Sequence, residues 1–298
     1  MTHEPDDFFR LDQPYSEVSS PSDFWEIVKD REEAVIADLL YRPDKLESRD
    51  PPRKWIIRNK KFSNFSFSKT HISQIEFTDC QFENCLFIGS IITDCRFNNC
   101  EFVTCNFYRS QIQNCFVDPK SFSQCTDSVK YPNIGVGLYQ ELLHNSRQQA
   151  QPEFARDAQY QFSRWKRYLS WDEIKSSNDG CIKKSMKCIG LFPSWLFELT
   201  TGSGMRLGNL ALTSVVMLFA FTFINFFCIS TFGLLLDQEP VQGLYESFYF
   251  STIVVTSLGF GDITPSTDVG RVAVAIEAII GFLTFATLVS MAFRRITN

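Results

Sequence analysis

Large apolar residues recur at every fifth position from Ile57 to Val117, and all thirteen places in this series are apolar. After the first turn, the position two before each of them is small or apolar, and the positions between are mostly polar. A period of five suits neither a helix nor a strand. It fits one face of a square coil, in which the large residue and its small partner both point inward. Four such faces make one coil, and stacked coils lie at strand spacing, about 4.8 Å apart.

These repeats resemble the pentapeptide-repeat family, whose fold is a right-handed quadrilateral β-helix. The resemblance implies about three coils over roughly residues 55–120, within a domain at 55–125. Cysteine often fills the small inward position where that family more often has alanine, and cysteine behaves as a small hydrophobe. We therefore interpret the following residues as core rather than as zinc ligands or disulfide partners: Cys80, Cys85, Cys95, Cys100, Cys105 and Cys115.

Helical segments are predicted on both sides of the repeats, because the ends of a solenoid must be covered. Residues 20–43 combine a serine N-cap, apolar positions near helical spacing and a final proline, which predicts a helical cap within residues 1–54. Residues 135–171 are predicted to form two helices broken at Pro152, within a helical connector at 133–190.

Two long apolar stretches follow. Leu207 to Leu236 contains no charged residue, and as a helix it would reach about 45 Å, more than the roughly 30 Å of a hydrocarbon core. A second stretch, Val272 to Phe293, contains one acid, Glu277, and the two membrane spans are placed at about 207–236 and 268–293. Residues 191–205 suit an interfacial segment, because tryptophan is favoured in the headgroup layer.

The charges beside the spans predict the orientation. Arg206 precedes the first span and Arg294 and Arg295 follow the second, whereas the connecting segment is mostly acidic. By the positive-inside tendency, both termini face the cytoplasm. The N-terminus is acidic and shows no signal peptide. We expect a multi-pass protein of the plasma (inner) membrane.

Residues 257–262, SLGFGD, lie between the spans and directly after a predicted short apolar helix at 243–256. Non-helical backbone at membrane depth is tolerated only where protein buries it or where it lines a water-filled pore. Gly259 and Gly261 permit backbone conformations that residues with a Cβ rarely adopt. Successive carbonyls can then turn toward one axis and replace the water shell of an ion. The segment therefore predicts a pore lining rather than a surface turn.

SLGFGD resembles the potassium-channel selectivity filter, usually written TVGYGD. The resemblance implies a two-span pore domain over 206–293 that assembles as a homotetramer and conducts K⁺, with no other cofactor. It implies the following residues: Ser257, Leu258, Gly259, Phe260 and Gly261 as the filter (257–261), Asp262 at the pore mouth, and Thr256, Tyr249 and Phe250 as filter support. Gly281 falls twenty residues after Gly261 and matches the family's gating-hinge glycine.

Three positions depart from the family's pattern. Phe260 has no hydroxyl to tie the filter to its aromatic cuff, Leu258 is longer than valine, and Ser257 lacks the methyl group of threonine. A non-selective monovalent cation channel is therefore the alternative to a potassium-selective one. Glu277 is an ionisable residue inside a span and hence a second gating candidate. Three placements stay open for it: behind the filter, toward a neighbouring subunit, or in a wet crevice.

Composition adds few constraints. The net charge of −5 averages a polar N-terminal part with a membrane part. The three histidines are far apart in sequence and no catalytic or metal spacing appears, so we expect no enzyme. Acidic and basic residues balance over residues 60–120, so we expect no nucleic acid partner and no DNA mimicry.

Control of the pore is expected from the N-terminal part. No span carries arginines at every third residue, and the second span ends five residues before the end of the sequence. The hypothesis is therefore gating by the pentapeptide-repeat domain, which would act through residues 191–206; an unknown ligand or protein partner of this domain stays open. From another class of function, the alternative is a membrane-anchored pentapeptide-repeat binding module.

Overall fold

The structure, a computed structural model, describes residues 7–29, 34–48, 54–177, 180, 183–184, 187, 190, 207–236 and 239–297. The chain divides into two compact units, residues 1–189 and 190–298, and each is described by itself. The predicted interfacial segment at 191–205 lies outside the described residues.

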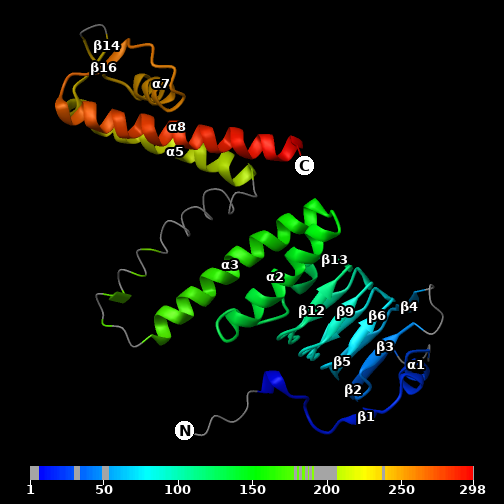
Figure 1. The fold of residues 1–298 in the computed structure, drawn as a ribbon. Helices are drawn as coiled ribbons and strands as arrows, with labels where there is room; N and C mark the ends of the chain where they lie inside the picture. The colour runs from blue at the N-terminus through cyan, green and yellow to red at the C-terminus, as the bar shows by residue number, and fades with distance from the viewer. Residues whose placement is uncertain are drawn as a thin grey trace. The chain divides into compact units, whose positions relative to one another are not determined.

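The first unit is built around a right-angled β-solenoid of about five turns (Figure 1). Its three parallel sheets have the orders β1-β2-β5-β8-β11, β13-β10-β7-β4 and β12-β9-β6-β3. The strands are β1 (Ser16–Val18), β2 (Val35–Tyr41), β3 (Lys45–Glu47), β4 (Trp55–Arg58), β5 (Lys61–Ser66), β6 (His71–Ser73), β7 (Ile75–Thr78), β8 (Gln81–Glu83), β9 (Ile91–Thr93), β10 (Arg96–Asn98), β11 (Glu101–Val103), β12 (Gln111–Gln113) and β13 (Phe116–Val117). Residues twenty apart pair in register, as Phe62 does with Phe82 and Phe82 with Phe102.

The large inward residues stack in columns along the solenoid axis. Phe62, Phe82, Phe102 and Phe122 lie face to face, with successive ring centroids 5.0, 4.8 and 4.4 Å apart. The small inward cysteines are buried and free, as the sequence predicts. Each repeat cysteine points its Sγ at a carbonyl of the preceding coil, as Cys105 does at 3.3 Å from the Phe82 oxygen. The cysteine at the inward position therefore fills the core and also makes a weak S–H···O hydrogen bond to the preceding coil.

The solenoid begins earlier than the sequence predicts. Among the described residues of this part, the α-helix is Pro21–Lys29 (α1), after a short 3-10 helix at Asp7–Phe9 (η1), and the expected continuation of the helix to residue 43 is wrong. Residues 35–41 form β2 instead, which pairs in parallel with β5. Ile36, Tyr41 and Leu46 already follow the five-residue period and are buried. Among the described residues, the next buried apolar one is Ile57, eleven positions after Leu46, so the five-residue register breaks here.

Helices close the C-terminal end of the solenoid. A 3-10 turn at Pro119–Phe122 (η2) is followed by the helices α2 (Pro132–Gln148) and α3 (Pro152–Ser176), which pack against each other. The break between the two helices comes just before Pro152. Asn145 of α2 is fully buried: its Oδ1 accepts from the Cys115 N–H at 2.8 Å, and its Nδ2 donates to the Cys115 carbonyl at 2.8 Å. One amide side chain thus completes the backbone hydrogen bonds of the last coil.

The second unit contains the helices α5 (Leu207–Phe227), α6 (Ile229–Phe232), α7 (Leu244–Val255) and α8 (Asp268–Thr297). Three short strands, β14 (Leu234–Leu236), β15 (Glu239–Pro240) and β16 (Ile263–Pro265), form an antiparallel sheet with β14 in the middle. α7 packs against both α5 and α8. The strand β16 directly follows SLGFGD, so the sheet fixes where that segment ends.

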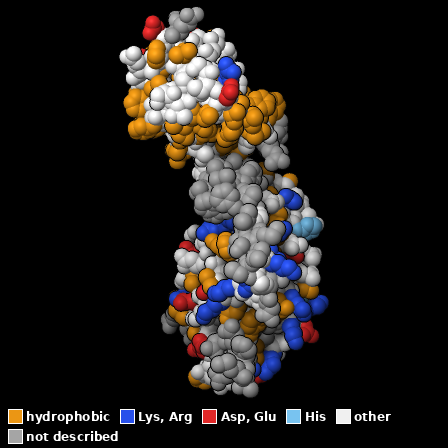
Figure 2. Space-filling view, turned by 90° about the vertical axis from the view of Figure 1, so that its left-hand side faces the viewer, with side chains coloured by type: hydrophobic (Ala, Val, Ile, Leu, Met, Phe, Trp, Pro, Cys, Tyr) orange, Lys and Arg blue, Asp and Glu red, His pale blue; other side chains and the backbone are white. Residues whose placement is uncertain are grey.

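Two helices of this unit are long and apolar enough to cross a membrane, Gly208–Phe227 and Asp268–Phe293. Their apolar side chains are largely exposed in this unit, as Leu212 and Phe223 are, and Figure 2 shows hydrophobic side chains gathered over these helices. The first helix is shorter than the predicted span of 207–236. It ends at Phe227; the short helix α6 follows, and Gly233, with a φ of +59°, ends α6 and turns the chain into β14.

Candidate functional site

The segment 257–261 leaves the C-terminal end of α7 without forming a helix or a strand. Its first amides remain attached to that helix: Ser257 donates to the Val254 carbonyl at 3.0 Å, and Leu258 donates to the Ile253 carbonyl at 2.9 Å. Gly259 donates to the same Ile253 oxygen at 3.3 Å. The position of the segment is therefore set by the last turn of α7.

The backbone of the segment takes the conformation for which glycine is suited. Gly259 has a φ of +54° and Gly261 a φ of +78°, both in the left-handed region. Ser257 also has a positive φ, +57°, which the sequence does not predict. A residue with a Cβ costs about 1–2 kcal/mol in this region. The two glycines of SLGFGD are therefore required by the backbone rather than by packing, since the space around their Cα atoms is open.

The carbonyl groups of residues 257–261 accept no hydrogen bond from any residue that the structure describes. The side chains beside them are exposed in a single subunit, Leu258 by 61% and Phe260 by 68%. The segment is thus not folded onto itself. It presents unpaired oxygens together with large apolar side chains that an assembly would cover.

Asp262 ends the segment and is tied to the helix before it. The Tyr249 hydroxyl of α7 donates to Asp262 Oδ2 at 2.7 Å. This bond lowers the pKa of the Asp262 carboxyl below its ordinary value of 3.8 and raises the pKa of the Tyr249 phenol. Phe260 has no hydroxyl to tie the segment to α7. Here the hydroxyl lies on the helix, in Tyr249, and the acceptor lies at the end of the segment, in Asp262.

We expect replacement of Tyr249 with phenylalanine to loosen the outer end of the segment. The bond favours ionised Asp262, so its contribution is present above pH 3.8 and is lost only as the pH falls through the lowered pKa. The wild type should hold a steadier current than Y249F at every pH above the lowered pKa of Asp262, and the two should decay alike once the pH falls below it. Single-channel recording during acidification measures this. Y245F is the matched control, since Tyr245 is 80% exposed; equal decay in the two variants would contradict the prediction.

The other predicted support residues lie on α7 and just after it. Phe250 is buried among Phe232, Leu234 and Ile263, so it anchors α7 to the small sheet rather than lining the segment. Thr256 caps the helix, where its Oγ1 donates to the Thr252 carbonyl at 2.6 Å. Tyr249 is adjacent to Phe250 on α7 and packs against the same cluster, while its hydroxyl reaches Asp262.

Glu277 lies behind α7, inside its own subunit. It is 4% exposed, and its Oε2 accepts from Asn225 Nδ2 at 3.0 Å. The same nitrogen donates to Ser251 Oγ at 2.8 Å. The hydrogen bond of Glu277 thus runs to α5 of the same chain, and its role in gating stays a prediction. Neither Asn225 nor Ser251 was predicted, because a single Asn or Ser in an apolar run gives no signal of its partner.

Gly281 lies one helical turn after Glu277 on the continuous helix α8. A Cβ built on Gly281 would lie 2.6 Å from the Val255 carbonyl oxygen and 2.7 Å from the Val255 Cα. Glycine therefore lets α8 approach the end of α7 closely. This is a packing reason for the glycine, and its role as a hinge stays a prediction.

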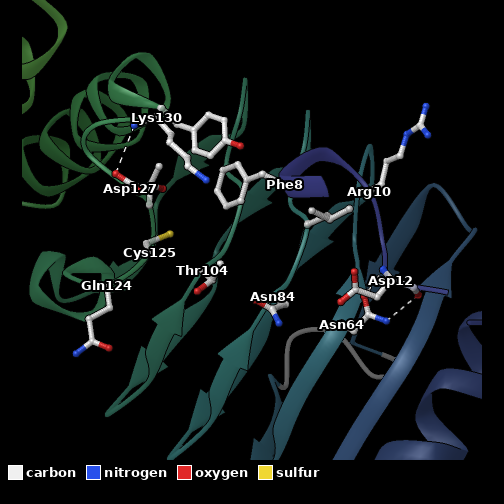
Figure 3. Close-up of a pocket in the computed structure, with 13 residues that line it drawn as sticks. Phe8, Arg10, Asp12, Asn64, Asn84, Thr104, Gln124, Cys125, Asp127 and Lys130 are labelled. Carbon is white, nitrogen blue, oxygen red and sulfur yellow. Dashed lines mark hydrogen bonds between the residues drawn. The ribbon is translucent and has the colours of Figure 1, made fainter. Parts of the chain in front are cut away.

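A cavity of about 560 Å³ lies in the first unit, where the N-terminal segment crosses one face of the solenoid (Figure 3). Asn64 fixes that segment by accepting from the Asp12 N–H at 2.9 Å and donating to the Asp12 carbonyl at 3.0 Å. Asn106 holds the Phe8 carbonyl at 2.9 Å, and Phe8 stacks on Tyr131 at 4.4 Å.

The lining of this cavity is polar and carries both charges. Corner residues spaced by twenty, Asn84, Thr104 and Gln124, form its floor, and Arg10 and Lys130 lie at its two ends. Its volume lies in the range of small-molecule sites. The solenoid therefore has room for a small polar ligand.

Comparisons with known proteins agree with this division of the chain. Residues 211–298 match the ion channel family, and residues 67–111 match pentapeptide repeats in nine copies. A stretch of 42 residues is 36% identical to the hyperpolarization-activated voltage-gated potassium channel of Methanocaldococcus jannaschii. That match covers 14% of this chain and 20% of the length of that protein.

Proposed function

We propose that this chain, a membrane protein that joins an ion channel domain at residues 211–298 to a pentapeptide-repeat solenoid, forms a potassium-selective channel from four identical subunits. One observation carries the proposal: residues 257–261 present unpaired backbone carbonyls on an open segment with two left-handed glycines. Four copies around an axis would replace the water shell of a dehydrated cation. Assembly would also cover Leu258 and Phe260.

The ligands of the ion would be the carbonyl oxygens of Ser257, Leu258, Gly259 and Phe260, with the Ser257 hydroxyl at the inner end. K⁺ is the permeant ion. Asp262, whose carboxyl is kept ionised by the Tyr249 hydroxyl, would add negative charge at the outer mouth and so concentrate cations there. Gly281 and Glu277, both on α8, are the gating candidates.

Reversal potentials of the purified full-length protein in planar bilayers, with K⁺ on one side and Na⁺ on the other, test the proposal. A reversal potential close to the K⁺ equilibrium value supports potassium selectivity. A value near zero supports the non-selective cation channel, which the shorter Ser257 side chain and the longer Leu258 side chain favour. No current from well-folded tetramers would leave the membrane-anchored binding module as the better description.

The solenoid would gate this pore from the cytoplasm, and the cavity beside Asn84 and Thr104 supports a ligand-controlled form of gating. Both termini would then face the cytoplasm, in the plasma membrane. Deletion of residues 1–190, which ends at the boundary between the two units, should change the open probability and leave the reversal potential unchanged. An unchanged open probability would contradict gating by the solenoid.

A further inference from the structure

A buried polar cluster lies in the apolar interior of the channel unit. It consists of Asn225 on α5, Ser251 on α7 and Glu277 on α8, which are 1%, 0% and 4% exposed. Each helix of the unit that packs around the filter segment thus contributes one polar side chain. The three side chains meet behind α7, on the side away from solvent.

Asn225 is the centre of the cluster. Its Nδ2 donates to Ser251 Oγ at 2.8 Å and to Glu277 Oε2 at 3.0 Å. An amide nitrogen carries two hydrogens, so both donors of this group are used. Leaving a buried polar group unpaired costs about 1–3 kcal/mol, whereas an apolar residue at the same position would cost nothing of this kind. The polar side chains of the cluster therefore satisfy one another's hydrogen bonds, and the cluster joins α5 to both α7 and α8.

The cluster is close to the filter along the chain. Ser251 lies two residues before Ile253, whose carbonyl accepts the amides of Leu258 and Gly259. Val254, the next residue, accepts the amide of Ser257. A shift of α7 at Ser251 would therefore move the carbonyls that hold the first three residues of the filter.

α8 contacts α7 a second time, one turn further along. Gly281 lies against the backbone of Val255, the last residue of α7. Glu277 and Gly281 are four residues apart and share one face of α8. The close approach at Gly281 and the hydrogen bonds at Asn225 thus fix α7 at both ends of its last turn.

We propose that Asn225 is a positioning residue for ion selectivity: through Ser251 and Glu277 it fixes the end of α7 and thereby the spacing of the filter carbonyls. The inference rests on the proposed function, since it needs a filter at 257–261. The Asn225 side chain itself would touch no ion. What Asn225 contributes is hydrogen-bond donors in a defined place, so a complementary donor–acceptor pair in either direction should preserve selectivity.

The test uses the full-length protein in planar bilayers and compares Asn225→Asp, Glu277→Gln and the double variant N225D/E277Q. N225D removes both donors and faces one carboxyl with another, and we expect the ratio of Na⁺ to K⁺ permeability to rise about tenfold. E277Q keeps an acceptor oxygen for Asn225, so this ratio should stay near that of the wild type. The double variant reverses the direction of the bond, because the glutamine amide can donate to the aspartate, and should restore selectivity.

Ser251→Ala keeps the volume nearly unchanged and removes one bond, so it remains informative if N225D fails to assemble. We expect it to raise the permeability ratio several-fold with normal tetramer recovery on size-exclusion chromatography. Unchanged selectivity in S251A, or a double variant no better than N225D, would overturn the positioning role while the proposed channel stands. A wild type without selective K⁺ current would overturn the proposed function itself.

Discussion

Replacing Gly261 with alanine is expected to abolish potassium current. Gly261 has a φ of +78°, where a residue with a Cβ costs about 1–2 kcal/mol. Four subunits carry the same change, so the conducting filter is destabilised by about 4–8 kcal/mol in all. This lowers its population by roughly three orders of magnitude or more. Flux of K⁺ into liposomes that contain the purified variant measures the loss.

Gly208→Ala is the matched control for this experiment. Gly208 lies on α5 with a negative φ, and a Cβ there meets nothing within 4 Å. G208A should conduct like the wild type, and both variants should elute as the same oligomer. If G261A conducted normally, backbone carbonyls at 257–261 could not be the ion ligands, because the conformation that exposes them would not depend on glycine.

The solenoid could be predicted from the sequence because its side chains repeat in register. Each inward residue, such as Phe82, stacks on its counterparts twenty positions away, so one period describes the whole core. The prediction failed where the period breaks. Leu46 and Ile57 are eleven residues apart, so the five-residue series does not extend back through Leu46, and the sequence predicts a helix where β2 lies.

The non-helical segment at 257–261 could also be recognised from the sequence, because its glycines suit a left-handed backbone; its role as a filter stays a prediction. The contacts that hold it could not be recognised in this way. Tyr249 and Asp262 are thirteen residues apart, and Asn225 and Glu277 are fifty-two apart. Such pairs form only after α5, α7 and α8 have packed, and no periodic pattern in the sequence predicts them. The local backbone conformation can thus be predicted from the sequence, whereas the side-chain contacts that hold it depend on tertiary structure.

The end of the first span shows the same limit. Leu234 to Leu236 are as apolar as the helix before them, so hydropathy extends the span to residue 236. The chain instead turns at Gly233 and pairs these leucines with Ile263–Pro265. Apolarity alone does not separate a lipid-facing helix from a strand that covers a small core. The turn at Gly233 was the available signal, since glycine commonly ends a helix in the left-handed conformation.

Gly281→Ala is expected to destabilise the tetramer and to reduce selective current strongly. A Cβ at this position would lie 2.6 Å from the carbonyl oxygen of Val255, and this backbone atom cannot move without moving the end of α7. Overpacking of this kind costs about 1–3 kcal/mol per subunit. The displaced helix end carries Ile253 and Val254, which hold the filter amides, so the Na⁺ to K⁺ permeability ratio should rise as well.

Thermal dissociation of the tetramer and reversal potentials, measured on the same preparation, separate the two roles of Gly281. A packing role predicts a lower dissociation temperature and weaker selectivity in G281A, with G208A unchanged in both. A hinge role predicts the opposite pattern: normal dissociation and normal selectivity with an altered open probability, since a hinge alanine stiffens α8 without moving α7. The second pattern would show that α8 and α7 are further apart in the assembled channel than in one subunit, and the contact at Val255 would then no longer explain the glycine.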